Sequence, residues 1–349
     1  MLRGRSCSLP MMLPRSPHSA PLTVALRVLL FSLLAPLPSL VAGQALNDHD
    51  NAPLSGIFGL QNSIEGGTLA GKNLHSWNFA SIISSHSVVK PGPDEQLKFD
   101  GETTRLNLMY RYGVTDRLEF GIEIPYLFHE SGNLDSIVVG WHDFFGLPNG
   151  VRNTLANDQI DFQYSDQSGE QVELSSSSNG IGDMRLLGGL HLFGSGTSNT
   201  ALRFGVKFPT GDSSQLHGSG GIDISIGIAG DFASLWGVER LNGFYRLSGT
   251  YIGEPEFLQN RYRKFIGTVS GGLGYYLTAV MELRAQTTLR TPLYDSEINA
   301  LGDSSAMLSF GANFRLSDRY TLALGVGEDI NVSTAPDVTF IITLDYQGG

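Results

Sequence analysis

Cysteine is nearly absent from this 349-residue chain, whose single thiol belongs to Cys7. Cys7 lies within the first 45 residues, which have the layout of a cleaved leader, so the chain that follows them has no cysteine. Disulfide bonds, thiol catalysis and cysteine metal sites are therefore excluded from a mature protein. Acidic residues are missing from the same 45 residues, which contain four arginines.

The apolar run of the leader, "VALRVLLFSLLAPLPSLVAGQA", follows three of those arginines, contains Arg27 and ends in small residues. A basic start, an apolar middle and small residues at Gly43 and Ala45 are typical of a secretory signal. We therefore predict a signal peptide over residues 1–45, cleaved near Gly43 to Ala45. A single transmembrane anchor is the weaker alternative, because the run is short and contains Pro36 and Pro38.

Basic residues are scarce in the rest of the chain. Removing the 4 leader arginines from 23 Lys and Arg leaves 19 against 34 Asp and Glu, a formal charge of −15. This balance argues against nucleic acid as a partner. Long apolar runs are also rare and glycine is frequent, with 43 residues, which argues against an α-helical membrane protein. No linker or change in composition divides the chain, which favours one domain.

The remaining chain is rich in strict alternation. In "MELRAQTTLR" (Met281–Arg290) the odd-numbered side chains are apolar or carry a methyl group, and the even-numbered ones are polar. A period of two predicts a strand with two unlike faces. Similar segments lie near residues 76–88, 102–112, 117–128, 180–193, 200–209, 221–232, 241–252, 264–276, 279–290, 305–316, 319–327 and 337–347.

Two architectures fit this alternation. A soluble sandwich would bury the apolar face, whereas a membrane barrel would expose it to lipid and turn the charges into its lumen. Each segment approaches or exceeds the roughly 9–11 residues with which a tilted strand crosses a bilayer. Short and long connections also alternate along the chain, as in outer-membrane barrels. We predict an all-β fold: a single antiparallel transmembrane barrel of about 12 strands over 76–347, with short periplasmic turns and longer extracellular loops.

Two further segments complete this organisation. Residues 46–75 are predicted to stay in the periplasm or to enter the lumen, because "PLSGIFGL" (Pro53–Leu60) is apolar but too short to span a membrane. The long extracellular loop 129–179 carries eight acidic residues against one base, Arg152. Their spacing matches no calcium loop, and no metal site is predicted.

The polar faces of the strands supply the candidate lumen residues. A charge in a lumen must be paired or hydrated, and Arg111 and Glu119 flank a short turn across which they can pair. Two readings stay open: a structural ladder that fills the barrel, or a charged constriction that selects solutes. The candidates are Arg105, Arg111, Glu119, Glu123, Arg185, Arg203, Lys207, Asp223, Asp231, Glu282, Arg284 and Arg290.

Four apolar residues stand out in the acidic loop 129–179: Trp141, Phe144, Phe145 and Leu147. An apolar cluster left in water is unfavourable. We predict that this cluster folds over the barrel mouth as a plug or rests on the lipid surface, and that the loop restricts access from outside.

A barrel enzyme is the rival class, because "HGS" (His217–Ser219) sets a base two residues from a nucleophile. That pair lies in a glycine-rich stretch, where side-chain geometry is poorly held. At His75–Ser76 and His86–Ser87 the two residues fall on opposite faces of a strand. We therefore predict no covalent chemistry, no catalytic residue and no cofactor.

Several stretches resemble known outer-membrane families. "FPTGD" (Phe208–Asp212), "GSGGID" (Gly218–Asp223) and "GDMRLLGGLHL" (Gly182–Leu192) resemble the outer-membrane barrels associated with phenol meta-cleavage. "NAPLSGIFGL", "WHDFFGLPNGVR" and "TPLYDS" resemble a related proteobacterial family of unknown function, family 3187. Such barrels commonly end on an aromatic residue, whereas Tyr346 is followed here by "QGG".

The resemblance implies the outer membrane as location, and membrane lipids and the barrel-assembly machinery as partners. It implies a channel or binding barrel for passive passage of small solutes, hydrophobic or aromatic ones included. The alternatives are an outer-membrane lipid-modifying hydrolase and a purely structural or surface-adhesive barrel.

Overall fold

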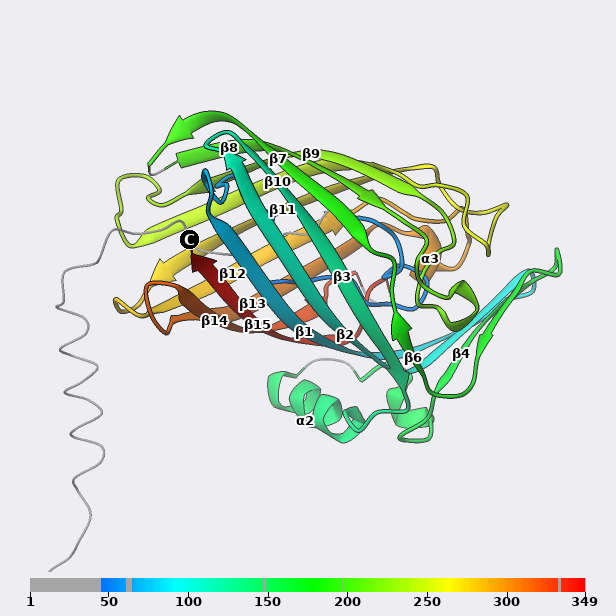
Figure 1. Cartoon of the computed structure of the whole chain (residues 1–349). Helices are drawn as coiled ribbons and strands as arrows, with labels where there is room; N and C mark the ends of the chain where they lie inside the picture. The colour runs from blue at the N-terminus through cyan, green and yellow to red at the C-terminus, as the bar shows by residue number, and fades with distance from the viewer. Residues whose placement is uncertain (1–44, 61–64, 147–148, 197, 332–333, 349) are drawn as a thin grey trace, which may run out of the picture.

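Twelve antiparallel strands close into a barrel in the computed structural model, which describes residues 45–60, 65–146, 149–196, 198–331 and 334–348 (Figure 1). The barrel strands are, in order around the wall, β1 (His75–Pro91), β2 (Glu95–Thr115), β3 (Leu118–Glu130), β7 (Arg185–Ser195), β8 (Ser198–Lys207), β9 (Asp223–Phe232), β10 (Leu241–Tyr251), β11 (Phe265–Tyr276), β12 (Met281–Arg290), β13 (Ser305–Arg315), β14 (Tyr320–Asp329) and β15 (Val338–Gly348). The predicted all-β barrel is confirmed.

The last strand closes the barrel by pairing with the first. Tyr346 lies opposite Trp77 of β1 and opposite Tyr320 of β14. The rings of Tyr346 and Tyr320 are 5.1 Å apart between centroids. The terminal aromatic residue is therefore part of the wall, and the "QGG" that follows it does not displace the register.

The burial of the strands is the reverse of that in a soluble protein. On β9, Ile224, Ile226 and Ile228 are 40–57% exposed, whereas Asp223 and Ser225 are 1% exposed. Apolar side chains point away from the barrel axis and charged ones point toward it, as lipid outside and a polar lumen inside require. This burial decides between the two architectures that the alternation left open. Among the described residues, no helix has the length and apolar character needed to cross a membrane.

The two ends of the barrel differ in their connections. At one end, here the short-turn end, the strands are joined through residues 116–117, 196–197, 233–240, 277–280 and 316–319. At the other, the long-loop end, they are joined through 92–94, 131–184, 208–222, 252–264, 291–304 and 330–337. In outer-membrane barrels short turns lie in the periplasm and long loops outside.

Two regions at the long-loop end differ from the sequence-based prediction. Residues 89–101, expected as a loop, belong mostly to β1 and β2, which run for 17 and 21 residues and turn at 92–94. Beyond the span of a bilayer β2 pairs with β4 (Asp161–Asp166), with Leu97 opposite Tyr164. β2 thus continues beyond the barrel because β1 and β4 remain as its hydrogen-bonded partners there.

The predicted long loop 129–179 has secondary structure of its own. It contains α2 (Asp135–Phe145), η1 (Arg152–Thr154), β4, β5 (Gln171–Leu174) and the start of β6 (Ser178–Ile181). β4 pairs with β2 and with β5, and β6 pairs with β3. Short helical turns η2 (Ser213–Gln215) and α3 (Asn299–Gly302) complete the long-loop end.

Candidate functional site

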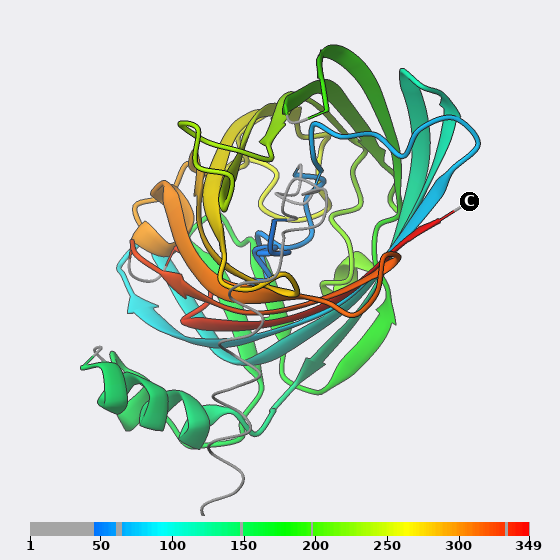
Figure 2. The ribbon, with the colours of Figure 1, turned by 90° about the vertical axis from the view of Figure 1, so that its left-hand side faces the viewer.

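The barrel encloses the segment that precedes its first strand. The name lumen segment is used here for residues 45–60 and 65–74: residues 45–60 lie within the ring of strands (Figure 2), and the segment ends in exposed residues 72–74 at the rim of the barrel. Leu46, fully buried, packs with Ala323 and Ile341 of the wall. Its backbone N–H donates to Gln286 at 2.8 Å, and the Gln286 amide donates back to the Leu46 carbonyl at 2.9 Å. The chain therefore does not cross the lumen freely but is bonded to the wall.

The first limb of the lumen segment follows β12 in register. Asp48 accepts from Thr288 at 2.7 Å, Asp50 lies 3.2 Å from Arg290, and both pairs are 240 positions apart, as is Leu46 with Gln286. A constant offset at every second residue means that the limb runs extended and parallel to β12, opposite its lumen-facing side chains. The limb therefore enters at the short-turn end and rises toward the long-loop end.

The second limb returns past the opposite wall. The Gly59 N–H donates to Asp223 at 2.7 Å, the Thr68 N–H to Asp231 at 2.9 Å, and the Ala70 N–H to Glu119 at 2.6 Å. The Asn73 N–H then donates to the Gly113 carbonyl at 2.7 Å, at the short-turn end, where β1 begins. Carboxylates of the wall thus hold backbone N–H groups that have no strand partner.

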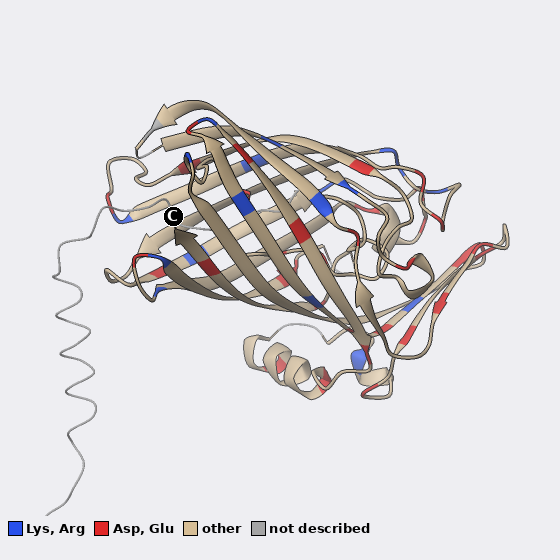
Figure 3. Ribbon diagram, in the orientation of Figure 1, with Lys and Arg blue, Asp and Glu red and all other residues tan. Residues whose placement is uncertain are grey.

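The twelve charged residues predicted for the lumen are all buried, at 9% exposure or less, and they are distributed over the strands (Figure 3). Arg111 lies 2.9 Å from Glu119, which confirms the pairing predicted across the short turn. Glu119 also contacts Arg203. Arg185 pairs with Glu123 at 2.8 Å.

Further pairs continue around the wall: Arg246 with Asp231 at 2.8 Å, Lys207 with Asp223 at 3.0 Å, and Arg284 with Glu282. Arg105 donates instead to the Gly56 carbonyl of the lumen segment. The residues form a network of ion pairs around the segment.

Sequence reasoning missed the carboxylates that the lumen segment itself contributes. Glu65 lies 2.9 Å from Arg111 and 3.6 Å from Arg185, and Asp50 lies near Arg290. The alternation of Asp48 and Asp50 was the available signal, since acidic residues two apart match the spacing of polar side chains on a facing strand. Their partners are more than 45 positions away, so the sequence did not identify them.

An apolar cluster, here the cap, closes the lumen at the long-loop end. Its members come from the lumen segment, the extended strands and several loops, and each is at most 9% exposed. Phe58 and Tyr294 lie with ring centroids 6.1 Å apart, and the Tyr294 hydroxyl donates to the Leu54 carbonyl at 2.6 Å. The cap includes Leu54, Ile57, Phe58, Leu60, Phe99, Phe162, Tyr164, Leu216, Ile252, Phe257, Leu258, Leu293, Tyr294, Ile298 and Leu301.

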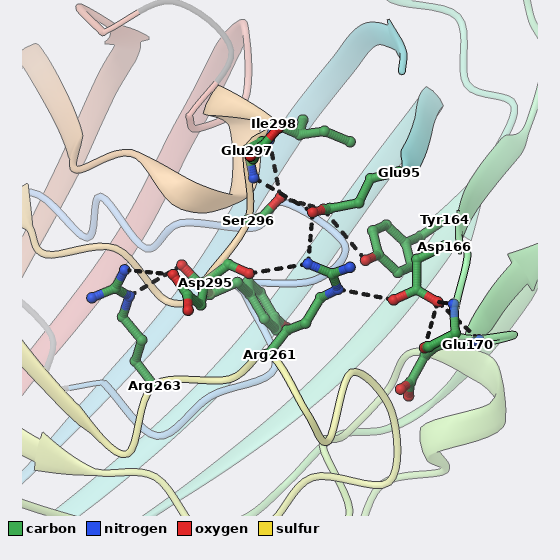
Figure 4. A network of polar contacts seen from close by, with 12 residues as sticks. Glu95, Tyr164, Asp166, Glu170, Arg261, Arg263, Asp295, Ser296, Glu297 and Ile298 are labelled. Atoms are coloured by element: carbon green, nitrogen blue, oxygen red, sulfur yellow. Dashed lines mark hydrogen bonds and ion pairs between the residues drawn. The ribbon is translucent and has the colours of Figure 1, made fainter. Parts of the chain in front are cut away.

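A polar latch ties the loops above the cap to the extended strands (Figure 4). Arg261, from the loop at 252–264, donates to Glu95 of β2 at 2.7 Å and to Asp166 of β4 at 2.9 Å. Ser296, from the loop at 291–304, donates to the same Glu95. Burial raises the pKa of Asp166, but the hydrogen bonds from Ser168 and Arg261 outweigh it and lower this pKa to about 2. The Asp166 carboxylate therefore carries charge at neutral pH.

The short-turn end is open by contrast. A cavity of about 470 Å³ lies there, with charged and polar residues in its lining. Arg111, Glu119, Arg203, Asp231 and Arg246 of the ion-pair network reach its wall, as do Leu69 and Ala70 of the lumen segment. A small solute can therefore reach the ion-pair network from the short-turn end. The lumen segment lies between this cavity and the cap.

The described residues of the predicted plug cluster, Trp141, Phe144 and Phe145, do not lie in the barrel mouth, whereas Phe162 and Tyr164 of the same loop belong to the cap. Helix α2 lies outside the barrel (Figure 2), and Phe144 and Phe145 are 80% and 55% exposed. Trp141 donates to Glu328 on the outer side of β14 at 2.6 Å, and Leu147 lies outside the described residues. The lumen segment and the cap already fill the mouth, which leaves these aromatic residues to pack elsewhere.

The histidine and serine residues considered for catalysis do not contact one another. Ser219 is fully buried and accepts from the Lys207 ammonium, while the His217 ring lies 3.2 Å from Ser178 and stacks on His129 at 5.5 Å. Burial lowers the pKa of His217. Within the described ranges, no three His, Cys, Asp or Glu residues are grouped closely enough to hold a metal ion.

The architecture has counterparts among solved structures. An outer-membrane channel of the COG4313 group from Pseudomonas putida F1 is 13% identical over 79% of this chain and 95% of its own, with a TM-score of 0.51. The NanC porin is 8% identical over 78% of this chain and 98% of its own, with a TM-score of 0.44. The P. putida toluene transporter TodX is 10% identical over 89% and 99%, with a TM-score of 0.37.

At 13% identity the likeness to the first of these structures shows the fold alone, that of an outer-membrane β-barrel. No curated protein matches the chain. A family model described as "Protein of unknown function (DUF3187)" matches residues 41–347, which is most of the chain. The chain therefore belongs to the DUF3187 family of outer-membrane β-barrels.

Proposed function

We propose that this protein is a channel for the passive passage of small solutes across the outer membrane, and that the described conformation is its closed state. The observation that carries this proposal is the lumen segment, which occupies the pore and is held by side chains rather than by strand pairing. Because the lumen segment is not a strand of the barrel wall, it can shift without loss of the strand pairing that closes the barrel. Export through the predicted signal peptide is part of the same proposal.

The chemistry of the pore favours small solutes with an apolar part. A solute that enters at the long-loop end meets the cap, whose aromatic and aliphatic side chains can exchange their mutual contacts for contacts with an apolar ligand. Beyond the cap it meets the ion-pair network, which disfavours a lone charge of either sign because most of its charges already have a partner of opposite sign. Small hydrophobic or aromatic molecules fit both regions.

Conductance in planar bilayers tests whether the lumen segment is the closure. A chain that begins at Thr68, refolded in detergent and checked for heat-modifiable gel mobility, lacks the first limb and the start of the second but keeps the contacts of Ala70 and Asn73. We expect a steady open channel, with conductance at least tenfold above that of the mature chain. Equal conductance would mean that the segment does not close the pore.

A disulfide variant keeps the full chain and tests movement directly. Asp48 and Thr288 hydrogen-bond at 2.7 Å, and the mature chain has no other cysteine to interfere. In Asp48→Cys/Thr288→Cys we expect the oxidised form to show no openings and the reduced form to recover the wild-type pattern. The single variant Asp48→Cys, oxidised in the same way, is the control. Openings that persist in the bonded form would show that solutes pass without movement of the first limb.

The two alternatives make different predictions. A lipid-modifying hydrolase would lose lipid products in His217→Ala, whereas the channel proposal expects no conversion of phospholipid or lipopolysaccharide by wild type or variant. Ser219 accepts from Lys207 and the His217 ring contacts Ser178 instead, which favours the channel. A purely adhesive barrel would show no solute flux even after the lumen segment is removed.

A further inference from the structure

Helix α2 lies against the outside of the barrel wall and is fixed there by polar contacts. The Trp141 indole N–H donates to the Glu328 carboxylate at 2.6 Å, and the His142 ring lies 3.9 Å from the same carboxylate. At its start Asp135 pairs with Arg152, which also reaches Asp337, just before β15, at 2.8 Å. Val138 is fully buried. One side of the helix is therefore committed to the barrel.

Helix α2 provides a partner for Glu328, a carboxylate on the outer face of β14. Glu328 shares the lipid-facing row of β14 with Leu324, which is 41% exposed, and with Ile330, just beyond the strand, which is 54% exposed. A carboxylate in such a row would face acyl chains or headgroups without a partner, which is unfavourable. Trp141 donates a hydrogen bond to it, and the His142 ring lies beside it. The helix thus sits at the level where the barrel wall meets lipid.

The exposed side chains of α2 form two stripes. At 100° per residue, Ile137 and Phe144 lie 20° apart on the helix and Phe145 lies within 100° of both; they are 54%, 80% and 55% exposed. Ser136, Gly140 and Asp143 form a polar stripe on another side and are also exposed. A helix with an apolar stripe and a polar stripe next to a membrane suits the interface between lipid and water.

We propose that α2 is an interfacial anchor that inserts Ile137, Phe144 and Phe145 among the acyl chains of the outer leaflet. Lipid is the occupant because the stripe continues the lipid-facing surface of β14 and β15, where Ile342 lies opposite Leu324 and is 48% exposed. The polar stripe then faces headgroups and water. Three large apolar side chains left in water would be an exposed patch of the kind that monomers avoid.

Fluorescent labels on neighbouring positions of α2 test the proposal. The mature chain has no cysteine, so Phe144→Cys and Asp143→Cys each give one labelling site, both on exposed positions that folding tolerates. Each variant, labelled with the fluorophore NBD, is reconstituted in phosphatidylcholine vesicles with or without brominated acyl chains. We expect the label at 144 to emit at shorter wavelength and to be quenched at least threefold more by brominated lipid than the label at 143. Aqueous iodide should give the reverse order.

Two results would overturn the proposal. Equal quenching of both labels by iodide would place the apolar stripe in water. Excimer emission from pyrene at Phe144→Cys, lost on dilution into excess lipid, would identify a second copy of the chain as the occupant instead. Neither result depends on conductance, so the anchor and the channel function are tested separately.

Discussion

The two ends of the lumen are closed to different degrees and by different forces. At the long-loop end the cap excludes water with apolar side chains that are at most 9% exposed. At the short-turn end a cavity of about 470 Å³ reaches the charged network. Apolar contact is non-directional and seals a space of irregular shape, whereas ion pairs and hydrogen bonds are directional and hold a chain in one register. The cap therefore seals the lumen, and the ion-pair network positions the lumen segment.

Removing Glu119 should have the largest effect on stability. Its carboxylate accepts from the Ala70 N–H and pairs with Arg111 and Arg203, so Glu119→Ala leaves two buried guanidiniums without it. Breaking a buried ion pair from one side costs about 3–5 kcal/mol, and we expect a loss of that size in urea unfolding in detergent. The control Glu239→Ala changes an exposed turn residue and should stay within about 0.5 kcal/mol. A similar loss of unfolding free energy in both variants would show that the ion-pair network does not position the lumen segment.

Shortening a cap side chain should have the next largest effect. Leu54 is fully buried among the cap residues, and a buried Leu→Ala change costs about 2–5 kcal/mol. We expect Leu54→Ala to lower the free energy of unfolding within that range and to produce a leak conductance, because a cavity opens in the seal. Leu316→Ala, in an exposed turn, is the matched control. Lost stability without a leak would show that the cap supports the fold but does not seal the pore.

Cutting the latch should have a smaller effect. Arg261 donates to Glu95 and Asp166, and a hydrogen bond to a charged group contributes about 1.5–3 kcal/mol. Because the Arg261 side chain is 25% exposed, we expect the lower part of that range for Arg261→Ala, together with more frequent channel openings. Arg263→Ala removes a pair whose partner Asp295 is 85% exposed, and should change stability by less than about 1 kcal/mol. Equal opening frequencies in the two variants would contradict the latch.

The smallest effect is expected from mild acid. The pKa of Asp166 falls to about 2 in the folded protein, against about 3.9 in an unfolded chain. A carboxylate whose pKa is lower in the folded protein stabilises the fold at pH values above its unfolded pKa. This stabilisation is lost as the pH falls through its folded pKa of about 2. The coupling free energy of Arg261→Ala with Asp166→Asn should therefore agree between pH 7.5 and pH 5 within about 0.5 kcal/mol. Coupling that disappears at pH 5 would show that the carboxylate is already protonated there.

Sequence reasoning located the barrel because its signals are local. Alternation with period two assigns each strand and its lumen face from about ten consecutive residues, and Arg111 and Glu119 are paired through a turn only a few residues long. The strands β4 and β5 were not anticipated, because they form only against the part of β2 that extends beyond the membrane. Helix α2 was not predicted, and the aromatic cluster that it carries was expected either as a plug or as a lipid contact, which the sequence did not distinguish.

The amino-acid sequence by itself determined which side chains share each face of a strand, because the period of a strand is a property of the backbone. Only the tertiary structure decided what fills the lumen. Asp48 and Asp50 meet Thr288 and Arg290 across 240 positions, and Arg261 meets Glu95 across 166. Contacts over such separations exist only after the barrel has closed, so no local pattern can specify them.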